Sequence, residues 1–195
     1  MGYELKKATI LVVDDMQPML ALTASLLKIF GFSDIIQAGD AETAWSKFCS
    51  KNPDIVLTDW LMEPFDGLDL IKKIRNDPAS PNRFVPIILM TGFSHRIRVE
   101  QARDIGVTEF LVKPFRAKDM YARIEMLIEK PRRFVETQQF FGPDRRRRKG
   151  DDYQGPLRRE NDDSKQAGGA DNNEAAALLR QLREDAKSKT EKTGK

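Results

Sequence analysis

Residues 9–15 read TILVVDD, an apolar run rich in β-branched residues that ends in two carboxylates. Three similar runs follow along the chain: DIVLTD at 54–59, VPIILMTG at 85–92 and EFLVKP at 109–114. None of them alternates apolar and polar residues, so each is expected to be a strand buried on both faces. Such strands are typical of a parallel sheet. DIIQ at 34–37 is a shorter and weaker fifth candidate.

Between these runs, apolar residues recur every three or four positions, which is the period of a helix. They share one face in three segments: Met19, Leu22, Leu26, Ile29 and Phe30; Ala41, Ala44, Trp45 and Phe48; and Met120, Ile124, Leu127 and Ile128. Gly31 and Gly106 follow two of the expected helices and are typical helix ends. Five strands alternating with five helices predict an α/β fold with a doubly wound, five-stranded parallel sheet. The ligand site of such a sheet lies outside the carboxyl ends of its strands.

Polar side chains stand at the expected carboxyl ends of four strands. Asp14 and Asp15 end the first strand, Asp59 the third, Thr91 the fourth and Lys113 the fifth. Each alone has a structural explanation, as a helix cap, a turn residue or a solvated lysine. Together, three carboxylates at one edge would repel each other unless a cation lay between them. Mg²⁺ fits that need and pairs carboxylates with phosphate oxygens, so the sequence predicts phosphoryl chemistry.

In order and spacing, ILVVDD, LTDWLMEPFDG, ILMTG and LVKPF resemble the diagnostic segments of response-regulator receiver domains, the CheY-like domains of bacterial two-component signalling. The resemblance covers about residues 7–130 and implies the sheet order 2-1-3-4-5. It implies a single-domain response regulator that takes a phosphoryl group from a sensor histidine kinase or a histidine phosphotransfer protein. The protein is not expected to be an enzyme, beyond its own phosphotransfer and at most a slow autodephosphorylation.

The resemblance also assigns a role to each residue of the acidic group. Asp59 would be the phosphoacceptor, the nucleophile that forms an aspartyl phosphate. Mg²⁺ would be held by four groups: the carboxylates of Asp14, Asp15 and Asp59 and the backbone carbonyl of Leu61. Lys113 and Thr91 would contact the phosphoryl group.

Signalling in this family depends on an aromatic residue three positions before the lysine, which is Phe110 here. A plain core phenylalanine is an equal alternative, because large apolar side chains are usually buried. Phosphorylation would shift the face formed by residues 94–130, the expected docking surface for a downstream protein. Leu61 and Phe93 are apolar where fast-hydrolysing relatives carry polar groups, so dephosphorylation is expected to need a phosphatase.

Residues 131–195 differ in composition from the rest of the chain. Up to Lys130 there are 17 Lys and Arg against 18 Asp and Glu, and after it 16 against 12, so the net charge of +3 arises from the C-terminal part. Apolar residues are too few there for an independent core, so a largely disordered basic tail is expected, with one possible helix at 174–187. FVETQQFFG at 134–142 is expected to be a short docking motif or to pack back onto the receiver.

The run RRRRK at 145–149 suggests an alternative function, a nucleic-acid-binding regulator with the tail as its output, although such runs are often only solvated. An unphosphorylated pseudo-receiver is disfavoured because no acidic or lysine position is missing. One His and one Cys rule out His/Cys metal clusters. No apolar run approaches about 18 residues, and the start MGYELKK lacks a signal core, so no membrane span and a cytoplasmic location are expected.

Overall fold

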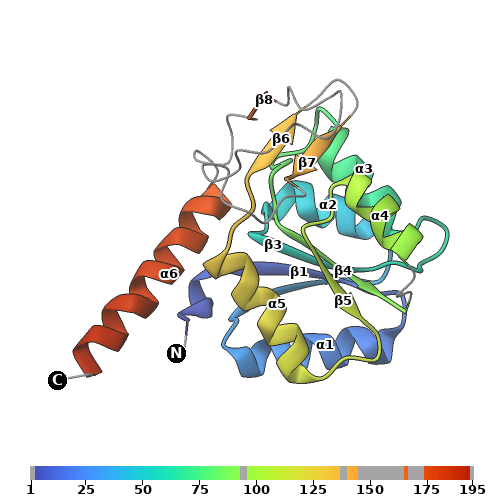
Figure 1. Ribbon diagram of the computed structural model, residues 1–195. Helices are drawn as coiled ribbons and strands as arrows, with labels where there is room; N and C mark the ends of the chain where they lie inside the picture. Colours follow the sequence, from blue (N-terminus) through green and yellow to red (C-terminus); the bar gives the residue numbers. More distant parts are fainter. Residues whose placement is uncertain (1–2, 93–95, 137–139, 145–164, 167–173, 194–195) are drawn as a thin grey trace.

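The computed structural model describes residues 3–92, 96–136, 140–144, 165–166 and 174–193 (Figure 1). Its centre is a five-stranded parallel sheet in the order β2-β1-β3-β4-β5. The strands are β1 (Thr9–Val13), β2 (Asp34–Ala38), β3 (Ile55–Asp59), β4 (Ile87–Thr91) and β5 (Glu109–Val112). The predicted α/β class, the strand order and the weak fifth strand are all confirmed.

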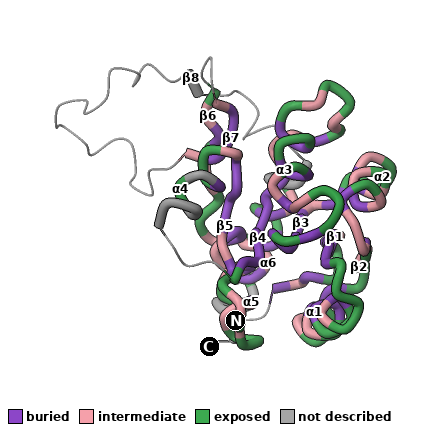
Figure 2. The backbone as a smooth tube through the Cα atoms, turned by 90° about the vertical axis from the view of Figure 1, so that its right-hand side faces the viewer, coloured by how far each residue is buried: buried purple, intermediate pink, exposed green. Residues whose placement is uncertain are grey.

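Helices cover both faces of the sheet: α1 (Gln17–Phe30) and α5 (Ala117–Glu129) lie on one face, and α2 (Ala41–Lys51), α3 (Gly67–Asn76) and α4 (Arg96–Ile105) lie on the other (Figure 1). Alternate residues of β1 point to opposite faces, so Ile10 and Val12 pack with α1 and α5, whereas Leu11 and Val13 pack with α2 and α3. Figure 2 shows the resulting pattern, with buried strands inside and helices whose outer sides are exposed.

The helix ends follow the signals in the sequence. Gly31 caps the C-terminus of α1 with a φ of 106°, and Gly106 follows α4 with a φ of 104°. At the N-termini of α2 and α3, the carboxylates of Asp40 and Asp66 accept hydrogen bonds from backbone N–H groups of the first turn. These caps determine where the helices that cover the sheet begin and end.

The C-terminal part contributes a second, antiparallel sheet and a long helix. The strands are β6 (Phe134–Glu136), β7 (Phe141–Pro143) and β8 (Lys165–Gln166), in the order β7-β6-β8. Phe134 and Phe141 are buried, and β7 packs against α3 and α4, so the described residues of FVETQQFFG pack back onto the receiver. The predicted helix is confirmed as α6 (Glu174–Thr193). The run RRRRK lies outside the described residues.

A fully buried arginine, Arg75 on α3, lies under the β6–β7 hairpin. Its Nε and Nη2 donate to the carbonyl oxygen of Gly106 at 3.1 and 3.0 Å, and its Nη1 donates to that of Arg83 at 2.8 Å. Its guanidinium carbon lies 5.1 Å from the ring centre of Phe134. Burial lowers the pKa of Arg75 to about 9, so the guanidinium is still charged at neutral pH. The hairpin therefore covers a buried cation.

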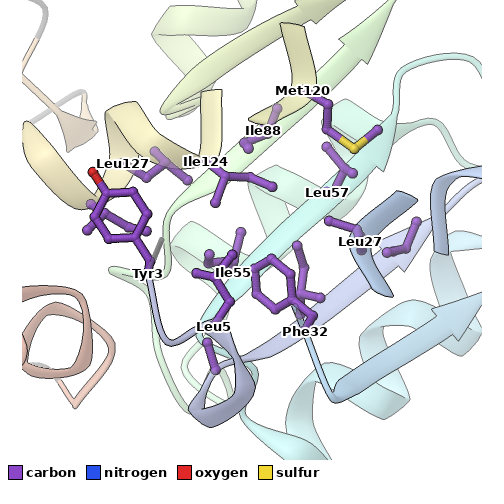
Figure 3. Close-up of a cluster of buried hydrophobic side chains, with 14 of the residues drawn as sticks. Tyr3, Leu5, Leu27, Phe32, Ile55, Leu57, Ile88, Met120, Ile124 and Leu127 are labelled. Atoms are coloured by element: carbon purple, nitrogen blue, oxygen red, sulfur yellow. The ribbon is translucent and has the colours of Figure 1, made fainter. Parts of the chain in front are cut away.

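The short 3₁₀ helix η1 (Leu5–Lys7) and the preceding Tyr3 pack beside α5 and α6. Figure 3 shows Tyr3, Leu5, Ile124 and Leu127 in one cluster of buried side chains. Leu182 of α6 belongs to the same cluster. No helix in the described part of the chain is both long and apolar enough to cross a bilayer.

Candidate functional site

Four parallel strands end at the edge of the sheet where the polar residues were predicted to meet. Asp14 directly follows β1, Asp59 is the last residue of β3, Thr91 is the last of β4, and Lys113 directly follows β5. The strand registers are aligned at this edge, since Asp59 pairs with Met90 and Thr91 with Val112. The structure therefore brings the predicted site residues to one edge.

Lys113 joins two of the carboxylates. Its Nζ lies 2.9 Å from Oδ1 of Asp59 and 3.1 Å from Oδ2 of Asp14. The other oxygen of Asp14 accepts a hydrogen bond of 3.0 Å from the backbone N–H of Met16, which holds the carboxylate in place. The peptide bond after Lys113, to Pro114, is cis. One ammonium group thus lies between two buried acids.

The three aspartates form a compact acidic group, in which one carboxylate oxygen each from Asp14, Asp15 and Asp59 lies within 4.8 Å of the others. Asp14 and Asp59 are buried, while Asp15 faces solvent. Lys113 offsets only one of the three negative charges, so a further cation would relieve the repulsion that remains. Clustered carboxylate oxygens suit a hard divalent ion such as Mg²⁺, and the residues present therefore fit the predicted metal.

Burial and the neighbouring charges shift the pKa values of both Asp59 and Lys113. Burial raises the pKa of the Asp59 carboxyl, and the negative charge of Asp14 adds to this, while the bond to Lys113 acts against it. Burial alone would lower the pKa of Lys113, but its hydrogen bonds and attraction to Asp59 and Asp14 raise it. Lys113 is therefore held as a cation beside a carboxylate whose negative charge is only partly offset.

A glycine that the sequence analysis did not single out closes the loop after Asp59. The N–H of Gly67, the first residue of α3, donates to the carbonyl oxygen of Trp60 at 2.9 Å. A Cβ atom on Gly67 would overlap the carbonyl oxygen of Asp59. Only glycine fits this close approach, and the signal that could have revealed it is its position at the end of MEPFDG, where a helix is expected to begin.

The remaining predicted residues take different positions. The side chain of Thr91 is buried. The backbone carbonyl oxygen of Thr91 accepts a 2.7 Å hydrogen bond from the backbone N–H of Lys113. Phe110 is half-buried and packs against the α2 and α3 core, which supports the core interpretation and leaves its switch role a prediction. Leu61, two residues after Asp59, has an exposed side chain. Phe93 lies outside the described residues.

The chain is similar to a known protein family over most of its parallel sheet. Residues 10–125 match the response regulator receiver domain family. Chemotaxis protein CheY1 of Helicobacter pylori strain J99 is 36% identical over 101 residues, which cover 50% of this chain and 78% of that protein. Chemotaxis protein CheY of Pseudomonas aeruginosa is 33% identical over 98 residues, covering 50% and 77%.

A solved structure leads to the same family. The crystal structure of a response regulator from Desulfuromonas acetoxidans superposes with a TM-score of 0.55 at 30% identity, covering 63% of this chain and 97% of that chain. The family match ends at residue 125, before β6 begins. The hairpin and α6 therefore lie beyond the part that defines the family.

Proposed function

The chain belongs to the response regulator receiver domain family, and from this membership we propose that it accepts a phosphoryl group on Asp59. The observation that carries the proposal is the position of the Asp59 carboxylate, 2.9 Å from the Lys113 ammonium and within an acidic group that fits Mg²⁺. A nucleophile beside a fixed cation and a metal site is the arrangement that phosphoryl transfer needs.

The proposed reaction moves a phosphoryl group from a histidine to an aspartate. The Asp59 carboxylate attacks phosphorus in a phosphohistidine of a sensor histidine kinase or phosphotransfer protein. The P–O bond forms as the P–N bond breaks, and the departing imidazole takes its proton from water. Asp14, Asp15, Asp59 and the carbonyl of Leu61 would hold Mg²⁺, which supplies positive charge to the phosphoryl oxygens when bound.

Two further residues are proposed to act on the transferred group. Lys113, already held as a cation, would remain paired with the negative charge that Asp59 gains on phosphorylation. Thr91 would donate its hydroxyl to a phosphoryl oxygen. That bond would draw the end of β4 toward Asp59, and we propose that Phe110 and the face of residues 94–130 respond and bind a downstream protein. We place this signalling in the cytoplasm.

The phosphoryl group is proposed to be long-lived unless a phosphatase acts. Leu61 lies two residues after Asp59, and its exposed apolar side chain offers no group to orient an attacking water. Leu61→Asn or Leu61→Glu should therefore shorten the lifetime of the aspartyl phosphate. The decay of phosphorylated protein after removal of the phosphodonor measures this lifetime, and an unchanged decay would contradict the assignment of Leu61.

The proposal is tested by phosphorylation with a small donor. The full chain is incubated with acetyl phosphate and Mg²⁺, and its intact mass is recorded. Wild type should gain one phosphoryl group and Asp59→Asn none. Glu63→Gln is a matched control, because Glu63 is an exposed carboxylate of the same loop and should leave the gain unchanged. Equal labelling of wild type and Asp59→Asn would place the phosphoryl group elsewhere and overturn the proposal.

A further inference from the structure

Helix α6 lies along a surface that α5 and η1 form together (Figure 1). Leu179, Leu182 and Ala186 are buried there and follow one stripe of the helix at positions i, i+3 and i+7. Tyr3, Leu5 and several α5 residues belong to the same core cluster. The surface therefore receives an apolar helical stripe.

Polar groups surround this apolar stripe and set its orientation. On α5, Glu129 accepts a 2.7 Å hydrogen bond from the hydroxyl of Tyr3, and its other carboxylate oxygen lies 3.4 Å from Nε of Arg183 on α6. Lys7 of η1 lies 3.7 Å from the carboxylate of Asp185. A helix seated here thus meets an acid on one side and a base on the other, which is a recognition pattern that depends on charge and direction.

The same contacts show that α6 is held weakly. Of the eleven positions of α6 whose burial the structure describes, three apolar ones are buried and Leu178 is half-buried, so a modest apolar area offsets the entropy of ordering the helix. The buried Nε of Arg183 lies near Glu129 but makes no hydrogen bond, so the ion pair is poorly aligned. β8 pairs with β6 of the hairpin, and seven residues separate the end of β8 from the start of α6, so the helix can leave its site while β8 stays paired.

We propose that the surface formed by η1 and α5 is a helix-binding site, which α6 occupies reversibly and which also accepts an amphipathic helix of a partner protein. The stripe of α6 defines the chemistry of that partner: leucines at i and i+3, a small residue at i+7, and an arginine at i+4 to face Glu129. No residue of this site belongs to the acidic group around Asp59, so the proposal does not rest on phosphorylation of Asp59.

The test uses the full chain and a labelled peptide of residues 174–193 as the partner helix. Leu182→Glu should release α6 and leave the site open, whereas Gln181→Glu adds the same charge at an exposed neighbouring position. In fluorescence anisotropy, the Leu182→Glu chain should bind the peptide about tenfold more tightly than wild type or Gln181→Glu, because bound α6 lowers the fraction of open sites. A peptide carrying Leu182→Glu should not bind.

The charge pair gives a second readout. Glu129→Arg in the Leu182→Glu chain should abolish binding of the natural peptide, and a peptide carrying Arg183→Glu should restore it. Equal affinity of wild type and Leu182→Glu, no binding to Leu182→Glu, or failure of that variant to fold would each overturn the proposal. A wild-type dimer that Leu182→Glu dissociates would also overturn it, because α6 would then occupy the site of a second copy.

Discussion

Two sets of buried charges in the described part of the chain, the acidic group and Arg75, are neutralised in different ways. Near the carboxyl ends of the strands, Asp14 and Asp59 share the Lys113 ammonium, and Asp15 adds a third negative charge at the surface. Under the hairpin, the Arg75 guanidinium donates to two backbone carbonyls and lies against an aromatic ring. The acidic group retains excess charge beside solvent, whereas Arg75 has three N–H groups satisfied by carbonyl oxygens. Charge that is only partly neutralised is typical of a reactive site, whereas a buried charge with its hydrogen-bond partners in place is typical of a structural one.

The largest expected effect is on the stability provided by the arginine. Arg75→Ala removes a fully buried side chain and leaves the carbonyls of Gly106 and Arg83 without these donors, so we expect a loss of about 3 to 5 kcal/mol in the free energy of unfolding. Lys72→Ala, an exposed position on the same helix, should change it by less than about 0.5 kcal/mol. Urea unfolding measures both. Equal effects would mean that Arg75 has no special structural role.

Removing the Lys113 ammonium, which Asp14 and Asp59 share, should slow phosphorylation more than it destabilises the fold. Lys113→Met leaves Asp59 without its ammonium partner, and we expect phosphorylation by acetyl phosphate to slow about 10²- to 10³-fold, or about 2.7 to 4 kcal/mol in the barrier. Lys118→Met, an exposed lysine of α5, is the matched control and should leave the rate unchanged. An initial rate like that of the control would remove Lys113 from the mechanism.

Mg²⁺ should stabilise the folded protein by binding to the acidic group, and Arg75 should have no part in this effect. At a concentration about 100 times its Kd, a ligand that binds only the folded state raises the free energy of unfolding by about 2.7 kcal/mol. We expect this gain in wild type and in Arg75→Met, and a much smaller gain in Asp15→Asn at the same concentration. Urea unfolding with and without Mg²⁺ provides the measurement, and an undiminished gain in Asp15→Asn would exclude Asp15 as a ligand.

The smallest effect concerns a carboxylate whose charge is well satisfied. Backbone N–H donation from Thr43 lowers the pKa of Asp40, opposite to the rise at Asp59. A lowered folded pKa stabilises the protein above the unfolded value and loses that contribution as pH falls through the folded value. Asp40→Ala should therefore cost about 1 kcal/mol at neutral pH. The cost, measured by urea unfolding, should be constant from neutral pH to about pH 5 and shrink as the pH falls below the ordinary carboxyl value of about 4, and a constant cost at acid pH would contradict the role of its charge.

The sheet and its acidic edge could be predicted because both depend on local patterns. Unbroken apolar runs indicate buried parallel strands, and residues at the ends of such strands meet whatever the details of packing. Asp59 and Lys113, more than fifty positions apart in the sequence, were expected at the same edge of the sheet, although β4 lies between their strands. The roles of Thr91 and Phe110 depend on movement that strand order does not describe.

The buried environment of Arg75 and the surface that α6 contacts could not be predicted, because residues far apart in the sequence form them. Arg75 reads as an ordinary charge near the end of a helix, and it becomes a buried cation only when Phe134 covers it. The helix itself was expected at 174–187, but the surface that α6 contacts depends on Tyr3 and Leu5. That N-terminal segment has no helical period long enough to reveal its packing.

The hairpin also matters for anyone who divides this chain into fragments. A fragment that stops at residue 130 would keep all five strands of the parallel sheet, but it would lose Phe134 and Phe141. The ring of Phe84, which lies 5.3 and 5.1 Å from those two rings, would then face water together with Arg75. Such a fragment should aggregate more readily than one that ends after Asp144, so the practical unit for expression includes the hairpin.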